Sequence, residues 1–188
     1  MNRSNRDTQD SLKTPKVIAR LIPDDGAMPN NPKLPLLVYQ GALELPEDDP
    51  AATIEALYER NQWGSTWRSP FVHPWHHYHS NAHEAITVYS GTATLQLGGE
   101  TDVILSVVPG DVLILPAGTG HKQLEASNDF GIVGGYPVGG PAWPSQVDTM
   151  NGSPGERPQA DENIASAALP QADPIYGAEG PMFDHWTG

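Results

Sequence analysis

Short segments in which polar and apolar residues alternate, separated by turns of glycine and proline, constrain the fold of this chain more than any other feature. Residues 84–89 end at Ser90-Gly91, and residues 92–97 end at Gly98-Gly99. The same pattern continues in residues 102–108, 111–115 and 130–136. Because strand side chains alternate between two faces, a period of two predicts strands. Many short strands with turns between them predict an all-β sandwich or barrel.

One stretch near residues 50–61 has the helical period instead. Asp49-Pro50 supplies an N-cap residue followed by a proline at the first helical position. Ile54, Leu57 and Tyr58 follow at helical spacing. These signals predict one short amphipathic helix within the β-rich chain.

The regular patterns are confined to the middle of the chain. Residues 21–32 and 137–188 are rich in glycine, proline and aspartate and show no sustained period. We therefore expect a barrel over residues 33–138, the helix included, between two extended arms. The N-terminal arm, residues 1–32, is expected to be partly flexible. The C-terminal arm, residues 139–188, is expected to pack on the barrel or on a partner subunit.

Charge and cysteine content exclude several classes of protein. The chain carries 23 acidic and 10 basic side chains, a formal net charge of −13, so a positive groove for nucleic acid is hard to build. It has no cysteine, which excludes disulfides, thiolate metal ligands and thiol nucleophiles. No apolar run reaches the roughly 18 residues of a membrane span, and residues 1–16 lack the apolar stretch of a secretory signal. We expect a soluble, cytoplasmic protein without nucleic-acid or membrane partners.

Histidines gather in one place along the sequence. Five of the seven lie between residues 73 and 83, and His77 and His79 are two apart, so on a strand they project from the same face. Glu84 begins the next strand, and a hairpin closing over residues 80–83 would bring its carboxylate beside both imidazoles. His121 would come from another hairpin. Three imidazoles and one carboxylate suit one divalent ion of Fe, Mn, Ni, Cu or Zn.

These residues also carry a family resemblance. The pattern His77-x-His79-x4-Glu84-x6-Gly91 resembles the second half of the first cupin motif. Gly110-x5-Pro116-x-Gly118-x2-His121 resembles the second cupin motif, in the right order and with 18 residues between the two motifs. The resemblance implies a double-stranded β-helix, a small antiparallel barrel of jelly-roll type. It also implies a metal ion inside one mouth, with His77, His79, Glu84 and His121 as its ligands.

The resemblance extends beyond the motifs to nearly the whole chain from about residue 30. Strings such as HHYHSNAHEAITVYSGTA and GDVLILPAGTGHK are similar to the YjlB-like group of bacterial single-domain cupins, for which no reaction is implied. The resemblance implies a homodimer. Two positions depart from the cupin motifs, because Phe71 stands where a glycine is expected and Glu125 where an asparagine is expected. Both positions serve turns or strands rather than ligation.

Other readings of the same residues stay open. The barrel mouth could be polar without holding a metal, and His79 and His83, four apart, would align if they lay on a helix. The sequence Ser80-Asn81-Ala82 favours a turn there instead. His83 is the nearest candidate for proton transfer. Three tryptophans before the site either pack in the barrel or form an aromatic wall for a ligand: Trp63, Trp67 and Trp75.

The prediction for function is a mononuclear metal-dependent enzyme with oxygenase-type or related chemistry on a small organic molecule. The alternative is a barrel that binds a small molecule or metal for sensing or storage without turnover, since one fold hosts many functions. A phosphosugar isomerase ranks lower because only Arg60, Arg68 and Lys122 lie near the mouth as basic residues. No GxGxxG or GxSxG motif supports a dinucleotide site or a serine hydrolase.

Overall fold

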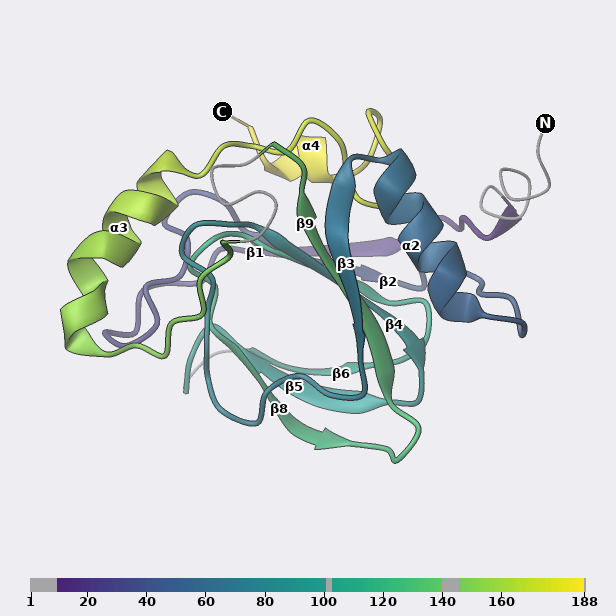
Figure 1. The fold of residues 1–188 in the computed structure, drawn as a ribbon, viewed down its shortest axis with the longest axis horizontal. Helices are drawn as coiled ribbons and strands as arrows, with labels where there is room; N and C mark the ends of the chain where they lie inside the picture. Colours follow the sequence, from purple (N-terminus) through teal and green to yellow (C-terminus); the bar gives the residue numbers. More distant parts are fainter. Residues whose placement is uncertain (1–9, 101–102, 140–145, 188) are drawn as a thin grey trace.

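Two antiparallel sheets face each other in the computed structural model, which describes residues 10–100, 103–139 and 146–187. The larger sheet has the order β1 (Lys16–Arg20), β2 (Leu36–Gln40), β7 (Val112–Leu115), β4 (Glu84–Ser90), β9 (Gly131–Pro137) and β3 (Trp63–Ser69). The smaller sheet has the order β6 (Val103–Val107), β5 (Ala93–Leu97) and β8 (His121–Ala126). Figure 1 shows the two sheets as opposite walls. The all-β, double-stranded β-helix prediction is confirmed.

Strand alternation explains how the larger sheet is buried on both faces. In β7, Leu113 and Leu115 point inward and pack with Leu95 and Leu97 of β5. The intervening Val112 and Ile114 belong instead to the outer cluster, which includes residues of α2 (Pro50–Arg60). Because neither face meets water, β7 is apolar at all four positions, as expected of a central strand.

The predicted helix is present as α2, Pro50–Arg60, and covers the outer face of the larger sheet. The Asp49 side chain accepts a hydrogen bond from the Ala52 backbone N–H at 3.2 Å, so it caps the helix as its position predicts. Ile54, Leu57 and Tyr58 are fully buried against the sheet. This apolar face fixes α2 on the barrel.

Both terminal segments contribute structure to the barrel. β1 pairs with β2 along its whole length, and so adds an edge strand to the larger sheet. Near the other end of the chain, Ile175, Met182 and Trp186 join the outer cluster beside α2. The residue ranges predicted for the barrel and its two arms stay predictions, and residues 1–9 and 140–145 of the arms lie outside the described part.

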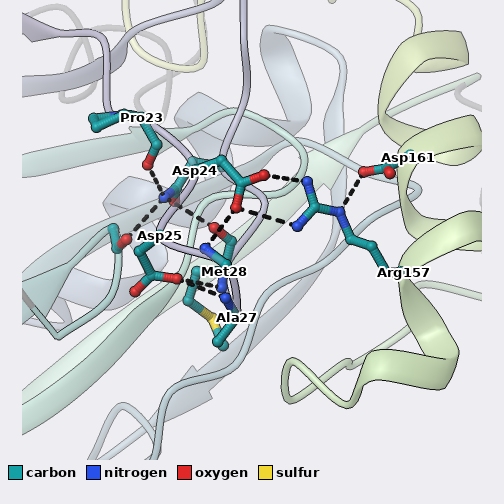
Figure 2. Close-up of polar contacts among 10 residues, drawn as sticks. Pro23, Asp24, Asp25, Ala27, Met28, Arg157 and Asp161 are labelled. Atoms are coloured by element: carbon teal, nitrogen blue, oxygen red, sulfur yellow. Dashed lines mark hydrogen bonds and ion pairs between the residues drawn. The ribbon is translucent and has the colours of Figure 1, made fainter.

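The C-terminal segment contains helical turns that the sequence did not predict: η1 (Pro154–Glu156), α3 (Arg157–Ser166) and α4 (Met182–His185). Figure 2 shows how α3 is tied to residues 24–28, because the Arg157 guanidinium lies between the carboxylates of Asp24 and Asp161. The bond to Asp161 measures 2.6 Å. Within the described ranges, no helix is long and apolar enough to cross a membrane.

Candidate metal centre

Four buried side chains converge inside the barrel mouth. One nitrogen from each of His77, His79 and His121 lies within 4.8 Å of the other two. The Glu84 carboxylate joins them, with Oε1 at 3.5 Å from His79 Nε2 and Oε2 at 3.3 Å from His121 Nε2. None of the four residues is more than 8% exposed. The structure thus brings together all four side chains that the sequence pattern singled out.

Strand pairing places these residues, although not by the expected hairpin. His77 pairs with His121 at the start of β8, with N–H···O distances of 3.2 and 2.9 Å in the two directions. Glu84 is the first residue of β4 and pairs with Leu115 of β7. The histidine segment thus pairs with β8 and β4 pairs with β7, so the two are not paired with each other as the strands of one hairpin.

Backbone carbonyls hold one nitrogen of each imidazole. The Nδ1 atoms of His77 and His121 lie 3.4 Å and 3.0 Å from the carbonyl oxygens of Trp75 and Thr119, and His79 Nδ1 meets that of Asp148. A carbonyl only accepts, so Nδ1 carries the hydrogen, and Nε2 of a neutral ring presents a lone pair. Metal-bound histidines are held in this way.

The Glu84 carboxylate supplies a test of whether a cation fits here. Its Oε2 is buried and has no hydrogen-bond partner, although His121 Nε2 is 3.3 Å away. Two lone pairs at that distance repel unless a positive charge, a proton or a metal ion, lies between them. The donor set of imidazoles and a carboxylate fits a divalent first-row metal.

The pKa shifts of His77 and Glu84 suit metal binding, whereas that of His79 favours a protonated ring while no metal is bound. Burial lowers the pKa of His77 to about 3, and the neighbouring imidazoles add to the shift. Burial would also lower the pKa of His79, but the Glu84 carboxylate outweighs it, and the net shift is upward. Burial alone would raise the pKa of Glu84, yet His79 and His121 hold it well below its usual range. Glu84 is therefore an anion at neutral pH and His77 a neutral ring.

A cavity of about 370 Å³ opens onto the four side chains. Trp67, Phe71 and Tyr136 form aromatic parts of its wall. The Tyr136 hydroxyl donates to Glu84 Oε1 at 3.3 Å, and its ring meets His79 edge-on with centroids 5.6 Å apart. Sequence reasoning missed Tyr136, because a tyrosine near the end of a glycine-rich strand carries no signal of its own.

The other residues singled out from the sequence have different surroundings. Trp63 is buried in the outer cluster, and Trp75 is 55% exposed, so Trp67 alone of the three tryptophans lines the cavity. His73 lines the cavity too, stacked on Trp75 with centroids 4.6 Å apart. His76 points toward Glu100, at 3.6 Å.

His83 is buried but is not among the residues that line the cavity. Its Nδ1 accepts the Ala117 backbone N–H at 3.0 Å, and its ring packs on Trp186 at 4.8 Å between centroids. Its Nε2 is buried without a hydrogen-bond partner. The proton-transfer role predicted for His83 stays a prediction, and these contacts give it no support.

Comparison with known proteins agrees with this geometry. The cupin domain family model matches residues 70–128, the stretch that contains all four side chains. Over 165 residues the chain is 42% identical to the uncharacterized protein YjlB of Bacillus subtilis strain 168, covering 88% of this chain and 93% of that protein. The chain therefore belongs to the cupin superfamily and, within it, to the YjlB-like group.

Solved structures with a similar barrel are more distant. The epimerase RmlC of Legionella pneumophila is 12% identical, with a TM-score of 0.36 over 64% of this chain and 71% of that one. The ribosomal oxygenase YcfD of Escherichia coli is 15% identical, with a TM-score of 0.38 over 69% of this chain. The match spans 46% of the YcfD chain, less than half its length. The family assignment depends on the YjlB match.

Proposed function

We propose that the protein is a mononuclear metal-binding cupin in which His77, His79, Glu84 and His121 hold one divalent ion of Fe, Mn, Ni, Cu or Zn. One observation carries the proposal. Three imidazoles are held through Nδ1 by backbone carbonyls, and the Nε2 atoms of His79 and His121 face a buried carboxylate whose Oε2 has no hydrogen-bond partner. A divalent cation would satisfy that oxygen and accept the lone pairs of the neutral rings.

The proposed activity is metal-dependent chemistry, oxygenase-type or related, on a small organic substrate. When bound, the ion would polarise a carbonyl or enolate, or activate oxygen. The chain supplies the surroundings for this chemistry. Trp67, Val72 and Ile86 make one wall apolar, so a bound molecule would exclude water from that side of the cavity. Tyr136 holds one oxygen of Glu84 and so orients the carboxylate.

The cavity favours an uncharged substrate of modest size. Among the described residues that line it, and apart from the histidines, Arg68 is the one cation, and its guanidinium is already bound to Glu55 at 2.8 Å and to Asp49 at 3.1 Å. A phosphosugar would find no free cation to neutralise its phosphate. The volume of about 370 Å³ lies near the lower end of small-molecule sites.

The metal content of the protein tests the proposal. Untagged protein is purified anaerobically without added metal and measured by elemental mass spectrometry, beside the double variant His77→Ala/His121→Ala. His185→Ala is the matched control, because His185 is exposed on α4. We expect near-stoichiometric metal in wild type and control and none in the double variant. Full occupancy in the double variant, or an empty wild type after reconstitution, would refute the site.

The alternative is a barrel that binds a small molecule or metal without turnover. It is favoured by the state of Tyr136, because burial raises the pKa of its hydroxyl, which therefore stays protonated and cannot act as a base. Oxygen consumption and product formation across a panel of uncharged aromatic and carbonyl compounds distinguish the two. Turnover by the metal-loaded wild type that is lost in the double variant supports the enzyme. Binding without turnover supports the alternative.

A further inference from the structure

The three imidazoles of the metal centre are held in two different ways. His77 and His121 each meet a carbonyl two residues earlier in the chain. The partner of His79 is the carbonyl of Asp148, 69 positions away in the sequence. The first two rings are thus positioned by the cupin motifs themselves, whereas the third depends on a segment outside both motifs.

That segment, residues 146–150, is fixed against the turn that follows His79. The Asp148 carboxylate accepts the Ser80 backbone N–H at 2.7 Å and also the Ser80 hydroxyl. In return, the Asp148 N–H donates to Asn81 Oδ1 at 3.1 Å. Met150 pairs with Tyr78 through two backbone bonds of 2.9 and 3.0 Å. The carbonyl that meets His79 is therefore held from both sides.

Helix α3 holds the same turn from another direction. Asn163 donates to the Ser80 hydroxyl oxygen at 2.8 Å, and Ala160 packs with Tyr78 in a small buried cluster. Arg157, at the start of α3, is bound in turn to Asp24 (Figure 2). The His79 turn lies between residues 146–150 and α3, and both elements belong to the C-terminal segment.

We propose that Asp148 is a positioning residue for the metal centre, acting through the His79 ring. Its carboxylate anchors residue 148 on Ser80, and its carbonyl then fixes the hydrogen of His79 on Nδ1 and leaves Nε2 for the metal. Losing such a partner typically weakens metal binding about 10- to 100-fold. The proposal rests on the proposed function for its metal, but the orientation of His79 is measurable without one.

Asp148→Ala removes the anchor and is tested by two measurements. Affinity for Zn²⁺ and for Mn²⁺, each added alone to metal-free protein, is measured by competition with a chelator, and we expect it to fall about 10- to 100-fold. In histidine-selective ¹⁵N NMR of the metal-free protein, we expect the hydrogen-bonded Nδ1–H signal of His79 to be lost. Asp148→Asn retains an acceptor for the Ser80 N–H and is expected to restore most of both properties.

Asp161→Asn is the matched control, since it weakens a carboxylate contact of α3 that does not touch the site. A merely structural role for Asp148 predicts that Asp148→Ala and Asp161→Asn both lower the melting temperature with unchanged metal affinity, which would overturn the proposal. Retention of the His79 signal in Asp148→Ala would also overturn it. If wild type binds no metal but Asp148→Ala loses the signal, the proposed function fails and the positioning role stands.

Discussion

Two cavities of this protein differ in size and in how their polar groups are satisfied. The larger, about 660 Å³, lies between residues 21–34 and α3. Its buried Asn30 bonds the carbonyls of Pro23 and Gly98 at 2.7 and 2.8 Å and accepts the Gly120 N–H at 3.1 Å. The smaller, about 370 Å³, contains Glu84 Oε2, which is buried without a hydrogen-bond partner.

The unpaired Glu84 oxygen distinguishes the two cavities as candidate ligand sites. An unpaired buried polar group costs about 1–3 kcal/mol, and a charged one more, so a fold retains it where something else supplies the partner. In the larger cavity Arg157 pairs with Asp24 and Asp161 (Figure 2). The unpaired oxygen of Glu84 therefore supports the smaller cavity as the proposed metal site.

Removing the unpaired oxygen gives the largest expected effect. Glu84→Gln keeps the shape of the side chain but lacks the anion, and we expect metal binding to weaken on the order of 100-fold or more, beyond the loss expected for an outer partner. Without metal, this variant should melt at a lower temperature than wild type, because the lowered pKa of Glu84 means that the fold stabilises the anion next to His79 and His121. Calorimetry with and without Zn²⁺ measures both. Unchanged metal affinity would contradict the proposal that the unpaired Glu84 oxygen marks the smaller cavity as the metal site.

Metal itself should stabilise the protein through the smaller cavity alone. At a free concentration of about 100 times Kd, the ion adds about 2.7 kcal/mol to the free energy of unfolding, or roughly 5–10 °C in Tm for a chain of this size. We expect chelator to reverse the shift. The His77→Ala/His121→Ala variant should show no shift, and an equal shift in that variant would place the ion elsewhere.

His83 lies outside both cavities, and its buried Nε2 also lacks a hydrogen-bond partner. It therefore tests whether such an atom by itself marks a ligand site. Burial lowers the pKa of His83 from 6.5 to about 4. Between these values the unfolded chain binds more protons than the fold, so stability falls as pH falls. From pH 7 to pH 5 this group alone should cost about 2 kcal/mol.

His83→Asn retains an acceptor for the Ala117 N–H but does not titrate. Urea unfolding at both pH values, with chelator present, should show a pH dependence smaller than that of wild type by about 2 kcal/mol. We expect its metal affinity to be unchanged at pH 7. Identical pH dependence in the two proteins would mean that His83 is protonated in the fold or is more accessible than its burial indicates.

The smallest effect is expected in the larger cavity. Arg157→Gln removes an ion pair whose partners are 32% and 43% exposed, so we expect less than about 1 kcal/mol of destabilisation. Metal affinity should not change, because the bonds from residues 146–150 to the His79 turn remain. Thermal unfolding and the Zn²⁺ competition assay measure the two properties. A large loss of metal would show that the two cavities are coupled.

The sequence predicted those parts of the molecule whose pattern is local. Short segments bounded by glycine and proline turns located β4, β5 and β7, and the spacing of His77, His79 and Glu84 brought out the candidate site. β3 was missed because it is polar and irregular, with a positive φ of 47° at Ser65. β8 is mostly polar, and α3 buries only Ala160 and Ile164, so neither shows a clear apolar period.

Asp148 was missed for a different reason. Its contact with His79 is made by a backbone carbonyl, which every residue has, and the partner lies 69 positions away. No residue type or spacing records such a contact. The four side chains that converge at the site were therefore predictable from sequence, whereas the backbone carbonyl that contacts one of their rings was not.

The distance along the chain between His79 and Asp148 has a consequence for synthesis. A ribosome adds roughly 5–20 residues per second, so the 69 positions between them take about 3–14 seconds to translate. The second cupin motif ends at His121, 27 positions before Asp148, so in the last part of that interval both motifs have been made but the His79 imidazole has no carbonyl to hold it. A nascent chain would therefore present a looser, less selective set of metal ligands than the finished protein.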